Sequence, residues 1–524
     1  MARESDMLRG VAVGMGSAIL ALGVGEFLGA ALADASLVAS VGDVAVDLAP
    51  GWLVRRTIGI LGAAQKPALL TGIICVAVVL GGWVGSRGTS GRVALGLAGL
   101  LGALAALRSG AGQGGVLAAA AAVGVGIFSL GASQQKADRP AVADGEDLHV
   151  EVGASPFEDP KVRAATRRRF LGYAGGLTVA GGALALGSRA LADRASASYR
   201  DVVLPSVRRT DGDRPAPTTT TEGPWRPPDG LSSWITPNDG FYRIDTALVV
   251  PRVDPTSWSM RIDGLVDRPL TFTLDDLLAR DLVDAAVTLS CVSNEVGGHL
   301  VGNAVWTGVP LIELLEEVGV RPDGEQVMGR SVDGFSAGFP RSVLDDARTA
   351  LVAVGMNGDP LPFRHGFPAR LVIAGLYGYV SAVKWLEQIE LTPMSVDGYW
   401  IPRGWAKEAP VKIASRIDVP LRSQTVSGRQ AVAGVAWAPV SGVEAVELAV
   451  DDGPWEECRL ERGVGPGRDG ESWVQWSTVW DPQPGARKLR VRAWDRAGQV
   501  QPERPKHIAP DGAEGYHARH IIVT

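Results

Sequence analysis

Long apolar segments fill the N-terminal part of the chain and constrain its fold more than any other feature. A helix that crosses about 30 Å of hydrocarbon needs about 20 mostly apolar residues. Residues 7–33 and 67–86 meet this requirement, whereas the apolar stretches 93–107 and 115–132 are shorter. Their richness in glycine and alanine is typical of helices that pack closely in lipid. The sequence therefore predicts a helical membrane bundle over residues 1–133.

Two features of this region depart from a plain bundle. Residues 38–61 contain two aspartates, a proline and two arginines, which favours an interfacial or re-entrant segment. Glu26 lies inside the first span, where an acid is either functional or simply tolerated at a helix interface.

A basic stretch and a further apolar run follow the bundle. Residues 134–165 are interpreted as a cytoplasmic linker, because lysines and arginines concentrate on that side of membrane segments. In residues 166–192 a Thr-Arg-Arg-x-Phe-Leu sequence precedes a glycine-rich apolar run, which resembles a twin-arginine export signal. The alternative is an ordinary fifth membrane helix with a positive flank. Both interpretations place the rest of the chain outside the cytoplasm, although Arg55, Arg56 and Lys66 in the first predicted outer loop argue against this topology.

The composition of the sequence changes from apolar to polar after this segment. Residues 193–232 are rich in proline, threonine and aspartate and predict an extended linker. Short strands, turns and two amphipathic helices follow. Thr273 and Asp276 form a capping-box pattern at the start of the first helix, and the second begins at Pro310 and ends at Gly319.

Cys291 lies between these two helices, at the end of a predicted strand. Val287 and Leu289 alternate with small polar residues before it, as on a half-buried strand. Cys75 and Cys458 are distant, so the sequence contains neither a Cys-x-x-Cys metal motif nor a disulfide framework. An isolated buried thiol is the ordinary interpretation of such a cysteine. The flanking motifs favour a functional one.

Cys-x-x-Asn at Cys291–Asn294, then "GNAVWTGVPL" and "RHGFPARLVIAGLYGYVSAVKWLEQIEL", resemble the molybdenum-binding domain of the sulfite oxidase family. The resemblance runs from Trp234 to the C-terminus. It implies an α+β molybdopterin-binding oxidoreductase domain over residues 233–412, a molybdenum-molybdopterin cofactor, and Cys291 as the metal ligand. Soft thiolate suits such a metal.

The resemblance also implies a set of cofactor-binding residues. A phosphate prefers guanidinium and ammonium partners, and a pterin edge prefers fixed donors and acceptors. Family members often have a histidine where Thr246 stands and an arginine where Ile244 stands. The implied cofactor-binding residues are Asn238, Phe241, Tyr242, Arg243, Thr246, Asp333, His365, Arg370, Ser381 and Lys384.

The implied reaction is a two-electron transfer of an oxygen atom, most directly on sulfite or a related sulfur compound. Sulfite-oxidising members of the family carry an arginine directly after Cys-x-x-Asn, but Glu295 occupies this position here. Arg403 or Lys407 is a candidate for a substitute charge, and Tyr399 for the active-site tyrosine. Two alternatives remain open: a reductase of S-oxides or N-oxides with the same fold, and a structural membrane protein that has lost its cofactor.

Residues 413–524 alternate between strands of six to ten residues and turn signals. This pattern predicts an immunoglobulin-like sandwich. The region also resembles the family's dimerisation domain, which implies a homodimer. Its tryptophans are interpreted as core and interface residues, namely Trp437, Trp455, Trp473, Trp476, Trp480 and Trp494.

Charge and histidine content restrict the partners. The net charge of -6 and the lack of a basic domain exclude a nucleic-acid binder. All six histidines lie outside the predicted spans and no Cys-x-x-Cys-His occurs, so haem is not expected. We therefore expect a small-molecule substrate and a separate cytochrome or quinone-linked electron-transfer protein. The expected location is the cell membrane, with several spans and an extracytoplasmic catalytic domain.

Overall fold

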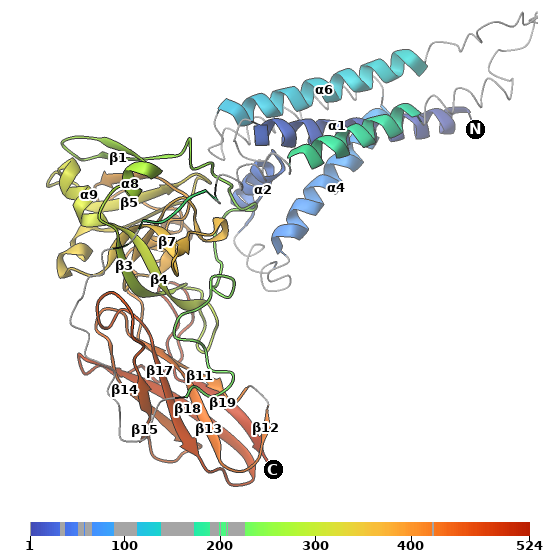
Figure 1. Ribbon diagram of the computed structural model, residues 1–524. Coiled ribbons are helices and arrows are strands. Elements are labelled where there is room, and N and C mark those ends of the chain that lie inside the picture. Colours follow the sequence, from blue (N-terminus) through green and yellow to red (C-terminus); the bar gives the residue numbers. More distant parts are fainter. Residues whose placement is uncertain are drawn as a thin grey trace, which may run out of the picture. The chain divides into compact units, whose positions relative to one another are not determined.

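The computed structural model (Figure 1) forms two compact units. The first comprises Met1–Ala197 with Ala247–Arg252, and the second comprises Ser198–Thr246 with Val253–Thr524. The structure describes residues 2–31, 37–50, 57, 65–87, 113–137, 172–188, 199, 201–205, 207, 226–421 and 424–524.

The described residues of the first unit lie mainly in helices. Two of its helices are long and apolar enough to cross a membrane, over Met7–Gly29 and Gln65–Gly85, while Leu37–Val46 and Leu117–Ser129 are shorter apolar helices. Residues 172–188 are also helical. The labelled helices of this unit are α1 (Ala2–Ala31), α2 (Leu37–Leu48), α4 (Gln65–Gly85) and α6 (Gln113–Ala137).

Glycines allow α1 and α4 to approach each other closely. A Cβ at Gly14 would clash with the carbonyl oxygen of Gly81, and one at Gly10 would lie 2.6 Å from the carbonyl oxygen of Gly85. Small residues at a helix interface permit such backbone contact. The predicted span 93–107 and the paired arginines before the last apolar run lie outside the described residues.

The first ten strands of the second unit form two five-stranded sheets. In the first, the strand order is β2-β1-β10-β5-β6, with β1 and β10 parallel and the other pairs antiparallel. In the second, the order is β3-β4-β7-β8, and β9 pairs with β7. The strands are β1 (Ser259–Gly264), β2 (Leu270–Thr273), β3 (Val283–Ser290), β4 (Val301–Pro310), β5 (Gln326–Ser331), β6 (Ser336–Pro340), β7 (Ala350–Met356), β8 (Asp359–Pro360), β9 (Arg370–Ile373) and β10 (Leu386–Thr392).

Short helices connect these strands and begin where local chemistry predicts. Thr273 and Asp276 form the expected reciprocal capping box of α8 (Leu274–Leu278). The second predicted helix, α9 (Leu311–Val318), ends at Gly319, whose φ of 69° suits glycine. The remaining short helices are α10 (Gly378–Ser381), η2 (Arg341–Asp346), η3 (Phe363–His365) and η4 (Ile401–Arg403).

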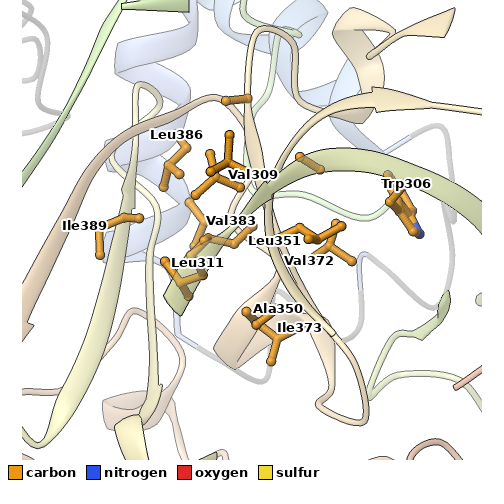
Figure 2. Packing of buried hydrophobic residues seen from close by; sticks show 14 of the residues in the cluster. Trp306, Val309, Leu311, Ala350, Leu351, Val372, Ile373, Val383, Leu386 and Ile389 are labelled. Carbon is orange, nitrogen blue, oxygen red and sulfur yellow. The ribbon is translucent and has the colours of Figure 1, made fainter. Parts of the chain in front are cut away.

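One continuous apolar core holds the two sheets together. Figure 2 shows part of it, with Val309 of β4, Leu351 of β7 and Val372 of β9 close to one another. Trp306 is fully buried in the same core, and its Nε1 donates to the carbonyl oxygen of Val287, 3.2 Å away. This packing fixes β3, the strand that leads to Cys291.

The prediction that β3 is half-buried was wrong, since its second half is buried on both faces. A segment of the C-terminal domain covers it. The backbone N–H of Thr288 donates to the carbonyl oxygen of Glu471, 3.0 Å away, and the Thr288 hydroxyl accepts from the backbone N–H of Trp473, 2.7 Å away. The small polar residues of β3 therefore face another part of the protein and not solvent.

The C-terminal domain is a two-sheet β-sandwich, as its alternating pattern predicted. One sheet has the order β11-β13-β17-β16 and the other β12-β19-β18-β14-β15. Trp476 and Leu489 are fully buried between them. The strands are β11 (Ala414–Val419), β12 (Thr425–Val426), β13 (Gln430–Trp437), β14 (Val443–Val450), β15 (Glu456–Glu457), β16 (Arg459–Glu461), β17 (Val474–Trp480), β18 (Gly485–Asp495) and β19 (His517–Val523).

Candidate functional site

Cys291 directly follows β3 and opens a tightly bonded turn. Its backbone N–H donates to the carbonyl oxygen of Leu300 at 2.9 Å, and its own carbonyl accepts from the backbone N–H of Asn294 at 3.0 Å. The side-chain Oδ1 of Asn294 accepts from the backbone N–H of Leu300 at 2.8 Å. The asparagine of Cys-x-x-Asn therefore closes the loop that fixes the cysteine. We call residues 291–300 the Cys291 turn.

Cys291 is buried, with 9% of the residue exposed. Burial raises the pKa of the Cys291 thiol, and hydrogen bonds from Ser293 together with the charge of Lys384 oppose this effect only in part. A bound cation that accepts the sulfur as a ligand reverses this balance, because coordination deprotonates a thiol.

His365 offers a buried lone pair. Its Nε2 lies 2.8 Å from the carbonyl oxygen of Asn238, which can only accept, so Nε2 carries the proton. Burial lowers the pKa of His365 to about 3, with the charges of Arg370 and Lys384 acting in the same direction, and the ring is neutral. Nδ1 is thus an acceptor, and it has no hydrogen-bond partner among the described residues.

Aromatic rings surround this histidine. The ring of Phe241 packs edge-on against His365 and Trp306, with centroids 5.7 and 5.6 Å apart, and stacks on Tyr242 at 5.1 Å. Burial raises the pKa of Tyr242, and Cys291 adds to this effect while Arg370 opposes it. The predicted residues Phe241, Tyr242 and His365 therefore form one cluster of rings.

Arg370 is a buried cation that contacts this cluster of rings. It is 3% exposed, its Nη1 donates to the carbonyl oxygen of His365 at 3.1 Å, and its guanidinium lies over the Trp306 ring at 4.8 Å. Burial lowers the pKa of Arg370 to about 10, which still leaves it charged at neutral pH.

Lys384 is a second buried cation, held by a residue that the sequence did not reveal. Its Nζ lies 3.1 Å from Oδ2 of Asp245 and 3.3 Å from the carbonyl oxygen of Arg364. Asp245 also forms a bidentate pair with Arg243, at 2.9 and 3.3 Å. The only available signal for Asp245 was its spacing of two residues from Arg243, which places both side chains on one side of an extended chain.

The other predicted cofactor residues have specific local roles. Thr246 donates its hydroxyl to Asp333 at 3.3 Å, which joins two loops of the site. Ser381 is fully buried, but its hydroxyl donates to the carbonyl oxygen of Tyr377 within α10 at 3.1 Å. Its hydroxyl thus stabilises a helix in this structure.

Tyr399 and Arg403 lie together. The Arg403 guanidinium lies 3.7 Å from the centre of the Tyr399 ring, which packs against Phe335 at 5.9 Å. Phe335 belongs to the Asp333 loop, so these two residues contact that side of the site. The ammonium of Lys407 instead binds Asp397 and the carbonyl oxygens of a neighbouring turn.

Tyr377 was not predicted as a site residue, although it lies in the motif "RHGFPARLVIAGLYGYVSAVKWLEQIEL". It is 5% exposed and lines a small cavity together with Ser290 and Asn294, at the Cys291 turn. Within the described ranges, no three His, Cys, Asp or Glu side chains gather as a metal site.

Two protein-family profiles match this part of the chain. The oxidoreductase molybdopterin binding domain matches residues 247–400, and the Mo-co oxidoreductase dimerisation domain matches residues 409–510.

Similar proteins include two curated enzymes. Nitrate reductase [NAD(P)H] of Hordeum vulgare is 28% identical over 318 residues, covering 49% of this chain and 35% of that protein. Mitochondrial sulfite oxidase of Drosophila melanogaster is 28% identical over 335 residues, covering 54% of this chain and 58% of that protein. The chain thus spans between about a third and somewhat over half of these relatives' lengths. Among solved structures, the sulfane dehydrogenase SoxCD from Paracoccus pantotrophus aligns with a TM-score of 0.47 and 23% identity, over 55% of this chain and 82% of that one.

Proposed function

Because the chain belongs to the sulfite-oxidase-type family of molybdopterin oxidoreductases, we propose that it transfers an oxygen atom to or from a small sulfur compound, with two electrons exchanged. This proposal rests on four buried groups in one domain, namely a thiol, two cations and a histidine whose Nδ1 has no hydrogen-bond partner among the described residues.

These residues fit a molybdenum-molybdopterin cofactor. Arg370 and Lys384 are cations 3% and 8% exposed, which suits an anionic phosphate group. The buried Nδ1 of His365 is an acceptor with no donor in the described part of the chain, and a pterin edge supplies N–H donors. The Cys291 thiol is the soft ligand of the set.

When bound, the cofactor supplies the two-electron chemistry of oxygen transfer. The protein contributes position and charge. The Cys291 turn holds the sulfur in place through Asn294 and Leu300. Asp245 holds Lys384 and Arg243 on one side, and the Asp333–Thr246 bond closes the loop on another. Tyr399 and Arg403 are proposed as substrate-side residues next to that loop.

The charge next to the metal ligand bears on the substrate. Glu295 follows Asn294 where sulfite-oxidising members carry an arginine, and it lines the cavity at the Cys291 turn. A carboxylate disfavours an anion such as sulfite. This observation supports the second candidate, reduction of an uncharged S-oxide or N-oxide, beside oxidation of sulfite or a related sulfur compound.

We further propose the setting in which the enzyme works. The two apolar helices support anchoring in the cell membrane. The arginine pair before the last apolar run supports placement of the catalytic domain on the extracytoplasmic side. The match to a dimerisation domain supports a homodimer, and electrons are proposed to pass to a separate cytochrome or quinone-linked protein.

Metal analysis and an activity scan test the proposal. The purified chain should contain about one molybdenum per protomer. With artificial electron carriers, it should oxidise sulfite or reduce methionine sulfoxide, dimethyl sulfoxide or trimethylamine N-oxide. Protein without molybdenum, from cells that make the cofactor, would refute the assignment. Activity on sulfite alone would reject the reductase candidate.

A further inference from the structure

Tyr377 lies between the Cys291 turn and a charged cluster of the C-terminal domain. Its ring lines a cavity of about 20 Å³, together with Ser290, Asn294 and Glu514. A polar cavity of this size has room for about one water molecule. It is far too small for a substrate.

Tyr377 brings a hydroxyl, which can donate a proton, to the lining of this cavity. Its oxygen accepts from the backbone N–H of Lys412 at 3.5 Å, and a Cβ on Gly512 would lie 2.5 Å from it. The described residues provide no hydrogen-bond acceptor for the hydroxyl proton, so this proton is available to a water molecule that enters the cavity. Burial raises the pKa of Tyr377 to about 12, so the group keeps its proton at neutral pH.

A chain of charged side chains continues from the cavity to the surface. Lys412 binds Asp511 at 2.9 Å and Glu514 at 2.5 Å. Lys506 binds the same two carboxylates at 3.0 and 3.6 Å, and its side chain is 43% exposed. Glu514 itself lines the cavity and also pairs with Lys412 and Lys506.

We propose that Tyr377, a water in this cavity and Glu514 form the proton path between the metal site and solvent. The inference rests on the proposed function. Moving an oxygen atom from water to a sulfur lone pair releases two protons and two electrons, and the electrons leave for the electron-accepting protein. The reverse reaction consumes two of each and releases water. Either direction needs a proton route through a buried site.

Several ionisable groups line the cavity or lie next to it, and they were compared as proton relays. Glu295 and Lys412 also line it, and Asp511 binds Lys412 beyond it. Lys412 is held by the two carboxylates of Asp511 and Glu514. Both Asp511 and Glu514 bind the exposed Lys506, and Glu514 is the one of the two that lines the cavity.

The rate of proton uptake while the molybdenum-loaded protein is reduced tests the proposed path. The molybdenum-loaded full chain is mixed in weakly buffered solution with reduced methyl viologen, whose oxidation releases no proton, and a pH-indicator dye follows the protons. Tyr377→Phe should slow proton uptake about 100-fold, the low end of what a positioned proton donor contributes. Glu514→Gln should also slow it. Molybdenum content should be unchanged in both.

Two neighbours provide matched controls. Tyr379→Phe removes a hydroxyl that donates to the carbonyl oxygen of Ala406, at 2.6 Å, and Glu503→Gln changes an exposed carboxylate. Both should take up protons at the rate of the unchanged protein. Wild-type rates in Tyr377→Phe and Glu514→Gln overturn the path, as does equal slowing in Tyr379→Phe. Should Tyr377→Phe fail to load molybdenum, Glu514→Gln decides alone. A wild-type chain that loads no molybdenum refutes the proposed function itself.

Discussion

Lys384 holds a buried charge whose cost in the cofactor-free protein can be measured. Its side chain is 9% exposed, and its partner Asp245 is 5% exposed. Despite this ion pair, burial lowers the pKa of Lys384 from 10.5 to about 8. The folded protein without cofactor therefore disfavours the ammonium relative to the unfolded chain.

The difference between the folded and unfolded pKa of Lys384 gives the free-energy cost of its buried ammonium. One pKa unit corresponds to 1.36 kcal/mol, so the ammonium costs roughly 3 kcal/mol at pH 7. Lys384→Met removes this cost, and Asp245 is not left alone because Arg243 still binds it in a bidentate pair. We expect the cofactor-free variant to be more stable by about 1–3 kcal/mol, as when apolar side chains replace buried ion pairs.

The pH dependence gives an independent check of sign. The folded pKa lies below the unfolded one, so between pH 8 and 10.5 the unfolded chain binds a proton that the folded protein has lost. Stability of the unchanged protein relative to Lys384→Met therefore rises with pH across this window. Below pH 8 the difference is constant and favours the variant.

Thermal unfolding of detergent-solubilised protein, from cells that cannot make the cofactor, measures this difference at pH 7 and 9.5. Lys488→Met, at an exposed lysine of β18, should leave the Tm nearly unchanged at both values. A Tm of Lys384→Met below that of the unchanged protein at pH 7 would refute the reasoning, as would a difference independent of pH. In cofactor-producing cells the order should reverse, because the anionic phosphate then compensates the ammonium and the variant loses molybdenum.

Three further outcomes are expected. Cys291→Ser should fold with an unchanged Tm but lose turnover and most molybdenum, since a hydroxyl is a poor substitute for thiolate; full activity would contradict its role as metal ligand. Gly297→Ala should lower stability by about 1–3 kcal/mol and reduce molybdenum content, because φ is 76° and a Cβ would clash with the His517 ring; an unchanged Tm would contradict this. Arg167→Lys with Arg168→Lys should block surface exposure of the catalytic domain if the export-signal interpretation holds, whereas normal protease accessibility in intact cells would favour a plain membrane helix.

Short-range features of this protein could be predicted from its sequence. The capping box of Thr273 and Asp276 and the helix end at Gly319 depend on residues within one turn of each other, and the structure has both. The apolar helices and the strand alternation of the C-terminal sandwich depend equally on local periodicity. The Cys-x-x-Asn motif likewise identified the turn around Cys291, because Asn294 closes that turn within ten residues.

Long-range contacts decided the rest. Asp245 and Lys384 are 139 positions apart, and only the fold brings the carboxylate to the ammonium. The burial of β3 depends on Glu471 and Trp473 of another domain, so its alternating pattern alone predicted a solvent-facing side that does not exist. Tyr377 gained its place beside the Cys291 turn in the same way, through packing against Gly512. A sequence pattern reflects interactions between residues that are close in the chain. Burial and charge pairing depend instead on which distant segments pack against a residue in the folded protein.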